Sequence, residues 1–555
     1  MPDHQVQIQL DLNVPMRDGV LLSADLYRPV GEGRWPAALC RTIYDSQQQR
    51  YVDWAYRFAQ NGYAALIQDC RGRYDSDGVW DPYVCETADG YDTQQWLGQQ
   101  PWCDGQIGTF GVSYLGFTQV LPAPLRSPYA RALVPIANQQ DNYGHLYCDG
   151  VLQLQNAIHF ARIGNRTMRS TSYPLLDLDS IYRRLPLISA LDDVADCPAY
   201  RLFVSHSTFD EYWKSYSLRD KYGEVDVPAY FITGWYDNLV HEGFKLFAGW
   251  KSQARSAETR ATTKLLVGPW THSLLGSAAP FGDLDFGPVA QVDIPGEHLR
   301  WYDRRLRGLD TGIDRQGALR IFVMGENVWR DEAEWPLART RFTPYYLRGQ
   351  GRANSRFGDG ELSRTPPGDE PPDRFTDDPD NPVPTQGGQS MFIDNTGPRD
   401  RRAIERRDDV LVYSTPPLER EVEVTGPIEV TLYAASSAVD TDFTATLVDV
   451  HPNGLAIILS EGIVRARFRD SLERPTPIEP GRVYPYRIAI WETSNLFKAG
   501  HRIRLEIASS NFPRFDRNLN TGGDPATDTE WRIAEQTVFH RSEYPSQVTL
   551  PVIPR

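Results

Sequence analysis

Residues 106–116, with the sequence QIGTFGVSYLG, join an apolar run to a helix-compatible segment through a short turn that contains a serine. The apolar run 106–110 predicts a strand, a short turn carries Ser113, and the residues that follow are compatible with a helix. Such a sharp turn lifts the serine oxygen to the top of a sheet, where the backbone N–H of Tyr114 faces the same space. The spacing departs from the general G-x-S-x-G pattern, because Leu115 stands where the second glycine belongs. An ordinary strand-to-helix turn is therefore the alternative interpretation.

Strand-like and helix-like segments alternate on both sides of this turn. This alternation predicts a mostly parallel sheet with helices on both faces, an α/β architecture. In such sheets the functional groups gather at the carboxyl ends of the strands. The predicted strands are the apolar runs 36–41, 64–69, 106–110, 131–136, 227–233 and 264–267, and helical spacing appears at 87–97 and 298–306.

Two further residues complete a pattern that includes Ser113. A serine is a weak nucleophile without a base, and in α/β-hydrolases the chain order is serine, acid, histidine. Asp237 follows the strand-like run 231–236, and His272 follows the run 265–269. Each of the three groups comes within a few residues of the end of an apolar run. We therefore predict a catalytic triad of Ser113, Asp237 and His272 on an α/β-hydrolase core.

Other residues compete for these roles. Asp69 also ends a predicted strand, but it precedes Ser113 and has Arg71 and Arg73 beside it, which favours a structural ion pair. His241 lies four residues after the predicted acid and is interpreted as a helix-surface histidine. The remaining candidates are interpreted as structural or solvent-facing: His145, His206 and His298.

The predicted sheet is interrupted and then followed by segments of different character. Residues 138–224 have helical periodicity and predict an inserted helical domain, and residues 349–388 are rich in Gly, Pro and Asp and predict a long surface loop. Period-2 strands dominate beyond it, with a hairpin at 451–454, which indicates a jelly roll. The predicted domains are residues 1–140 and 226–336 for the hydrolase core, 141–225 for the insertion and 337–555 for the β domain.

Composition excludes several classes of protein. The 555 residues carry a net charge of −15, which argues against a nucleic-acid partner. The six cysteines form no C-x-x-C pair, no metal cluster has ligand spacing, and no phosphate-binding loop is present, so neither metal nor cofactor is expected. The chain begins without a visible signal peptide and contains no apolar run of 18 residues, which favours the cytoplasm without a membrane partner. Assembly into a homo-oligomer stays open.

Several long strings of residues resemble the CocE/NonD family of serine hydrolases, and the resemblance covers nearly the whole chain. It implies a split α/β-hydrolase domain, a helical insertion and a C-terminal jelly roll. It also implies that the Tyr44 hydroxyl completes an oxyanion hole with the N–H of Tyr114. The resemblance rests on GVSYLG (111–116), GWYD (234–237), GPWTH (268–272), DCRG (69–72), FVMG (322–325), DTDFT (440–444) and SNFP (510–513).

The resemblance further implies an acyl pocket formed by Leu239, Met391 and Phe392. Leu239 stands where a characterised member of the family has an aromatic residue, so the preferred acyl group can differ. We expect hydrolysis of a small-molecule ester with an aromatic or bulky apolar acyl group through an acyl-enzyme.

Two alternatives remain at this point. Amide-cleaving relatives are α-amino acid ester hydrolases, β-lactam acylases and X-Pro dipeptidyl peptidases. Those that bind a free amine need carboxylates near the triad, for which Glu242, Asp210 and Glu211 are the candidates. The second alternative is a non-catalytic protein whose jelly roll binds carbohydrate on an inactive hydrolase scaffold.

Overall fold

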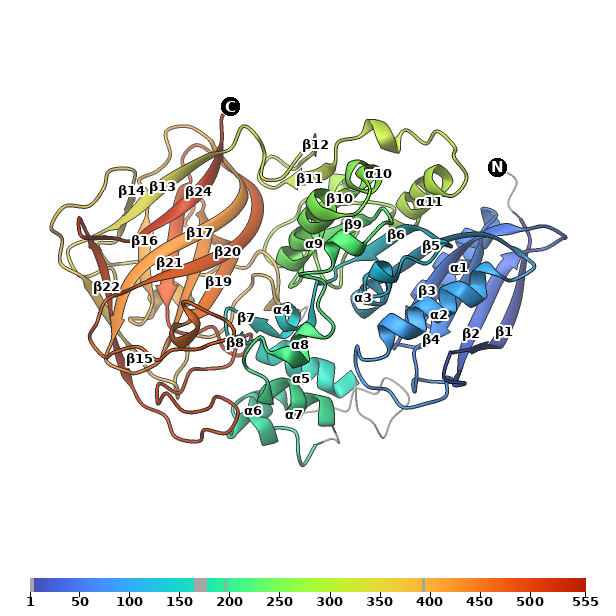
Figure 1. Ribbon diagram of the computed structural model, residues 1–555. Coiled ribbons are helices and arrows are strands. Elements are labelled where there is room, and N and C mark those ends of the chain that lie inside the picture. The colour runs from blue at the N-terminus through green and yellow to red at the C-terminus, as the bar shows by residue number, and fades with distance from the viewer. Residues whose placement is uncertain (1–3, 164–176, 195–196, 392–394) are drawn as a thin grey trace.

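The computed structural model describes residues 4–163, 177–194, 197–391 and 395–555. Ten strands of the first half of the chain form one sheet, in the order β1-β2-β4-β3-β5-β6-β9-β10-β11-β12 (Figure 1). The strands from β4 to β11 pair in parallel, and antiparallel strands close both edges. The strands are β1 (Val6–Pro15), β2 (Leu21–Pro29), β3 (Trp35–Thr42), β4 (Ala64–Asp69), β5 (Cys103–Val112), β6 (Ala130–Ile136), β9 (Tyr230–Tyr236), β10 (Lys264–Thr271), β11 (Leu319–Val323) and β12 (Val328–Glu332).

Helices connect the parallel strands, as the alternating pattern predicted. α1 packs next to α11, and α2 packs next to α3. The buried strands β4 and β10 are apolar along almost their whole length because both faces of the sheet are covered. The helices are α1 (Gln49–Gln60), α2 (Glu86–Gly98), α3 (Tyr114–Val120), α9 (Val240–Gln253), α10 (Ala257–Thr262) and α11 (Ile294–Arg305).

A helical insertion separates β6 from β9, and it lies between the two sheets in Figure 1. Part of the predicted insertion, residues 164–176 and 195–196, lies outside the described residues. Its described elements are α4 (Asn142–Leu146), β7 (Tyr147–Cys148), β8 (Val151–Leu152), α5 (Leu154–Ile163), α6 (Leu178–Tyr182), α7 (Pro198–Ser205) and α8 (Glu211–Lys214).

The C-terminal part is a second, almost entirely β structure, and the predicted fold class is confirmed. The hairpin predicted at 451–454 joins β18 to β19, with Val450 paired to Ala456. The long loop predicted over 349–388 was wrong in part, because two short strands form there: β14 pairs with the preceding strand β13, and β15 pairs with the distant strand β22. The strands are β13 (Arg341–Arg348), β14 (Glu361–Ser363), β15 (Asp373–Asp377), β16 (Leu411–Ser414), β17 (Val422–Ser436), β18 (Asp442–Val450), β19 (Ala456–Arg465), β20 (Tyr484–Phe497), β21 (Arg502–Ala508), β22 (Ala534–Arg541), β23 (Tyr544–Pro545) and β24 (Gln547–Ile553).

The insertion and the second sheet are joined by buried polar contacts as well as by apolar packing. Arg465 pairs with Asp442 at 2.9 Å and with Asp516 at 3.0 Å, and all three side chains are almost completely buried. Asp516 also accepts the backbone N–H of Leu152 at 3.0 Å, from the insertion. The large apolar core of the hydrolase sheet extends into both neighbouring parts. The domain boundaries at 140, 225 and 336 stay a prediction.

Within the described ranges, no helix has the length and apolar character needed to span a lipid bilayer.

Candidate active site

Ser113 occupies the turn between β5 and α3 with a strained backbone. Its φ is 64° and its ψ is −123°, a conformation that residues other than glycine rarely adopt. The turn is held on both sides, because the Ser113 N–H donates to the Ile136 carbonyl at 2.8 Å and the Gly116 N–H donates to the Ser113 carbonyl at 2.8 Å. Strain held in this way is typical of a nucleophile presented above a sheet.

The displaced second glycine of the motif has a structural explanation. A Cβ on Gly111 would lie 2.4 Å from the Cβ of Leu115, so the glycine before the serine makes room for the leucine after it. A Cβ on Gly116 would lie 2.9 Å from the Asn138 Cβ and 3.0 Å from the Ile136 carbonyl oxygen. The close backbone approach therefore occurs at position 116, one residue later than in the general pattern.

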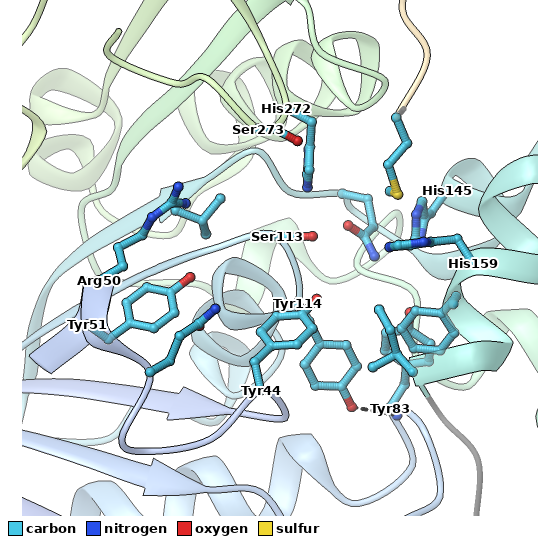
Figure 2. A pocket seen from close by; sticks show the side chains of 16 residues that line it. Tyr44, Arg50, Tyr51, Tyr83, Ser113, Tyr114, His145, His159, His272 and Ser273 are labelled. Atoms are coloured by element: carbon cyan, nitrogen blue, oxygen red, sulfur yellow. Dashed lines mark hydrogen bonds between the residues drawn. The ribbon is translucent and has the colours of Figure 1, made fainter. Parts of the chain in front are cut away.

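Asp237 and His272 meet at the same edge of the sheet. Asp237 directly follows β9, and His272 directly follows β10. The His272 Nδ1 lies 3.0 Å from the Asp237 Oδ1, which also accepts the backbone N–H of Leu239 at 2.8 Å. Asp237 is fully buried, whereas the His272 side chain is 12% exposed. Figure 2 shows the His272 ring directed toward Ser113, so its second nitrogen, Nε2, is the one that faces the serine.

The two predicted oxyanion residues line the same cavity as Ser113. Tyr44 follows β3, and its backbone N–H donates to the Thr42 hydroxyl at 2.9 Å. Tyr114 is the first residue of α3, directly after Ser113, so its backbone N–H lies in the turn. The structure thus brings both tyrosines to the serine from two neighbouring strands.

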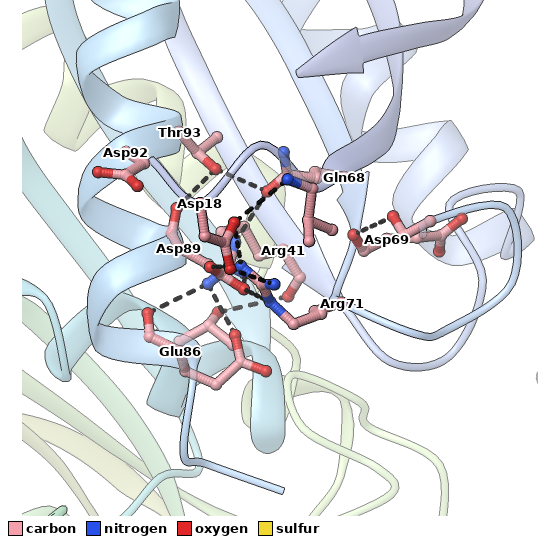
Figure 3. A network of polar contacts seen from close by, with 12 residues as sticks. Asp18, Arg41, Gln68, Asp69, Arg71, Glu86, Asp89, Asp92 and Thr93 are labelled. Atoms are coloured by element: carbon pink, nitrogen blue, oxygen red, sulfur yellow. Dashed lines mark hydrogen bonds and ion pairs between the residues drawn. The ribbon is translucent and has the colours of Figure 1, made fainter. Parts of the chain in front are cut away.

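The Tyr114 side chain is anchored in a buried charged network beneath the site. Its hydroxyl donates to the Glu86 Oε1 at 2.8 Å and accepts the Tyr83 backbone N–H at 3.1 Å. Glu86 pairs with Arg41 at 2.7 Å, and Arg41 donates through Nε to the Gln68 side chain at 2.8 Å (Figure 3). All of these side chains are buried. The sequence carries no local signal for this network, because its side chains come from two strands, β3 and β4, and two helices, α2 and α3.

Asp69 does not form the ion pair with Arg71 that its neighbours in the sequence suggested. Arg71 pairs with Asp18 and with Asp89, both at 2.7 Å (Figure 3). Asp69 accepts the backbone N–H of Ser46 at 2.9 Å, and burial raises the pKa of its carboxyl to about 8. The predicted structural ion pair of Asp69 is therefore not made with Arg71, because Arg71 lies after the end of β4 and its guanidinium reaches Asp18 and Asp89 instead.

A cavity of about 610 Å³ opens in front of Ser113. Met391, from the C-terminal half, lines this cavity as the resemblance implied. Leu239 lies outside this lining: its side chain is buried in the core at 1% exposure. Phe392 falls outside the described residues. The lining consists of Tyr44, Gln48, Arg50, Tyr51, Tyr83, Val112, Ser113, Tyr114, Gln139, His145, His159, Phe160, Ile163, His272, Ser273 and Met391.

Two histidines of the insertion, His145 and His159, lie in this cavity. His145 was predicted to be structural or solvent-facing, yet its buried ring lines the same cavity as Ser113. Burial lowers the pKa of the His145 imidazole to about 3, and the nearby His272 adds to this effect. Position in the inserted segment was the only signal in the sequence, because the packing of the insertion over Ser113 cannot be inferred from local spacing.

The carboxylates that an amine-binding site would need lie elsewhere. Glu242 pairs with Lys245 at 2.8 Å, and Asp210 contacts His206 at 2.6 Å. Among the described residues that line the cavity there is no Asp or Glu. His241, expected on a helix surface, is half-buried and contacts Glu492 at 3.0 Å.

One group of described residues has a spacing that could suit a metal ion: Asp449, His451 and His501, whose ligand atoms all lie within 4.8 Å of one another. No sequence motif marks this group, because the two histidines lie fifty positions apart in the chain. The His501 Nδ1 is already 2.8 Å from Asp449, and the two imidazole rings lie 4.5 Å apart. A hydrogen-bonded pair beside a second ring accounts for this group, which belongs to the C-terminal sheet and not to the cavity.

Comparison with known proteins agrees with this geometry. Residues 18–274 match the X-Pro dipeptidyl-peptidase (S15) family, and residues 311–549 match the X-Pro dipeptidyl-peptidase C-terminal non-catalytic domain. The cocaine esterase of Rhodococcus sp. (strain MB1 Bresler) is 40% identical over 585 residues, which cover 100% of both chains.

Solved structures show the same fold. An aminopeptidase from the marine sediment archaeon Thaumarchaeota archaeon is 23% identical, with a TM-score of 0.86 over 100% of this chain and 97% of that one. A CocE/NonD family hydrolase from Staphylococcus aureus is 17% identical, with a TM-score of 0.72 over 98% of this chain and 94% of that one.

The split parallel sheet and the strained serine turn define an α/β-hydrolase, and the comparisons support the predicted class, a serine hydrolase that cleaves esters. Given the match to the Rhodococcus enzyme over its full length, the chain belongs to the CocE/NonD family of serine hydrolases.

Proposed function

We propose that this protein hydrolyses carboxylic esters through an acyl-enzyme formed on Ser113, with His272 as general base and Asp237 as the residue that orients it. The observation that carries the proposal is the arrangement of three groups at the end of the sheet. Ser113 stands on a strained turn, His272 is directed toward it, and Asp237 lies 3.0 Å from the other nitrogen of the imidazole.

The role of each His272 ring nitrogen follows from the side chain that it faces. Because Nδ1 faces the Asp237 carboxylate, it carries the proton, and Nε2 is left to accept the proton of the Ser113 hydroxyl. Ser113 Oγ then attacks the ester carbonyl, the C–O bond to the alcohol breaks, and His272 returns the proton to the departing oxygen. Water repeats the sequence on the acyl-enzyme and releases the acid. The fully buried Asp237 side chain stabilises the imidazolium that forms in each step.

Two donors stabilise the oxyanion in this proposal, the Tyr114 N–H and the Tyr44 hydroxyl. Both tyrosines line the cavity with Ser113. Such donors act on charge that develops only in the transition state, so they increase kcat more than they strengthen substrate binding.

The cavity wall counts against substrates that carry a free α-amine. An α-amine on the substrate would need a carboxylate, and the described lining offers none. This favours esters over the amine-bearing substrates of the amide-cleaving alternative. Met391 and Phe160 give the wall an apolar portion that suits the hydrocarbon part of an acyl group.

The test combines labelling with a single substitution. We expect a fluorophosphonate probe to label the protein at Ser113, and Ser113→Ala to lose both the label and the turnover of p-nitrophenyl esters while circular dichroism stays unchanged. Substantial turnover by folded Ser113→Ala would contradict the mechanism. A labelled protein that cleaves aminoacyl amides faster than esters would favour the amide alternative.

A further inference from the structure

His145 is held on the wall of the cavity by the short helix α4. The Asp141 side chain caps this helix by accepting the Gly144 N–H at 2.7 Å. Figure 2 shows His145 and Arg50 on opposite sides of Ser113. The His145 residue is only 5% exposed, and its ring packs edge-on against Phe160 at 6.2 Å. Its position is therefore fixed by packing, with the ring next to the space where substrate would lie.

Neither ring nitrogen of His145 has a hydrogen-bond partner among the described residues. Buried polar groups in proteins almost always have one, because leaving them unpaired is destabilising. The His145 imidazole is more than nine-tenths buried and lines a cavity. Its two ring nitrogens are therefore available to form hydrogen bonds with a molecule that enters the cavity.

The charge state of the His145 ring limits which chemical groups of that molecule it can bind. Because the pKa of His145 is lowered to about 3, its ring is neutral at physiological pH and offers one N–H donor and one nitrogen acceptor. A neutral ring attracts neither a carboxylate nor an ammonium group strongly. The described lining contains no carboxylate, and the guanidinium of Arg50 belongs to an exposed residue at the other side of the site. The complementary group is uncharged and able to donate or accept a hydrogen bond.

We propose that His145 binds an uncharged hydrogen-bonding group of the substrate, a hydroxyl in the simplest case, so that the preferred ester carries such a group near its scissile carbonyl. This inference rests on the proposed hydrolysis at Ser113 and narrows its substrate class. It also adds a polar requirement to the aromatic or apolar acyl group expected from the sequence. A site built to bind a hydroxyl rejects the analogue that lacks it, because the buried ring is then left unpaired.

The experiment compares esters that differ by one hydroxyl. The first pair is methyl mandelate and methyl phenylacetate, and the second is methyl 3-hydroxy-3-phenylpropanoate and methyl 3-phenylpropanoate. The ratio of kcat/KM within each pair is divided by the ratio of the alkaline hydrolysis rates, which removes intrinsic reactivity. The proteins are the wild type, His145→Leu, and the matched control His206→Leu, whose histidine lies in the same insertion but contacts Asp210 outside the cavity lining.

We expect the wild type and His206→Leu to prefer the hydroxyl ester of at least one pair by about tenfold or more, and His145→Leu to lose that preference. The comparison uses only the ratio within each pair, so a general change in the rate of His145→Leu on both esters affects neither outcome. An equal ratio in the wild type and in folded His145→Leu would overturn the inference. Equal ratios are the result expected if water, and not the substrate, forms the hydrogen bonds of the His145 ring.

A second measurement covers the case in which His145→Leu fails to fold. In Ser113→Ala protein with ¹⁵N-labelled histidine, the ring signals of His145 should move when the hydroxyl ester binds and stay in place with its analogue. Signals that respond to both esters alike, or to neither, would overturn the inference. Failure of the proposed function at Ser113 can be distinguished from failure of the inference about His145, because Ser113→Ala would then retain ester turnover.

Discussion

Replacing Tyr114 by phenylalanine removes one hydroxyl from the contact between α3 and α2 and leaves the aromatic ring in place. In the wild type that hydroxyl donates to the Glu86 carboxylate at 2.8 Å and accepts the Tyr83 N–H at 3.1 Å. A hydrogen bond to a charged group contributes about 1.5–3 kcal/mol net, so the free energy of unfolding should fall by about that amount. Arg41 still pairs with Glu86 at 2.7 Å, which keeps the carboxylate from being left without any partner.

The same substitution should slow catalysis, because the Tyr114 backbone N–H is the proposed oxyanion donor. Complete loss of such a donor costs about 10²–10³ in kcat, and here the donor remains but is held less firmly. We expect kcat to fall about tenfold, which corresponds to about 1.4 kcal/mol, with KM changed much less. Steady-state kinetics on one p-nitrophenyl ester and urea unfolding measure the two effects.

Tyr413→Phe is the matched control. The Tyr413 hydroxyl also donates to a buried carboxylate, Asp373, at 2.7 Å, but in the C-terminal sheet. This variant should lose comparable stability and keep the kcat of the wild type. If Tyr114→Phe also kept the wild-type kcat, the network would be structural only, and its role in positioning the oxyanion donor would be refuted.

Three further outcomes are expected. Tyr44→Phe should lower kcat by about 10²–10³ with little change in KM in steady-state kinetics. A kcat within a few-fold of wild type would refute the role of the Tyr44 hydroxyl as an oxyanion donor. Prolonged EDTA treatment should leave esterase activity unchanged, since the proposed triad needs no Lewis acid; a loss restored by added metal would contradict this. Burial raises the pKa of Asp69 from 3.8 to about 8, so folding takes up a proton between these values and wild-type stability falls as pH rises through this window. Asp69→Asn cannot ionise, so its stability relative to wild type should increase from pH 5 to 8 in urea unfolding and level off above; a constant difference would show that Asp69 titrates normally.

The residues at strand ends could be predicted from the sequence for a physical reason. Ser113, Asp237 and His272 each follow an apolar run, and the parallel sheet brings the carboxyl ends of those runs to one edge. The fold class followed from the same alternation of strands and helices. Local pattern and tertiary arrangement agree at these positions.

Prediction failed where a residue's surroundings depend on distant segments. Leu239 is next to Asp237 in the sequence, but only its backbone N–H contributes to the site while its side chain turns into the core. His145 reaches the cavity only because the described part of the insertion packs beside Ser113. Arg41 and Glu86 meet through the packing of α2 on β3. None of these contacts leaves a periodic signal in the chain.

Met391 and the insertion residues His145 and Phe160 share one wall with Ser113, although they come from three separate regions of the chain. The chemical step and the choice of substrate are thereby encoded by different segments of the gene. Mutations in residues 142–163 or around position 391 can redirect selectivity during evolution without disturbing the strands that carry the proposed triad. A directed-evolution library confined to those segments would sample new ester preferences while the hydrolytic sheet stays constant.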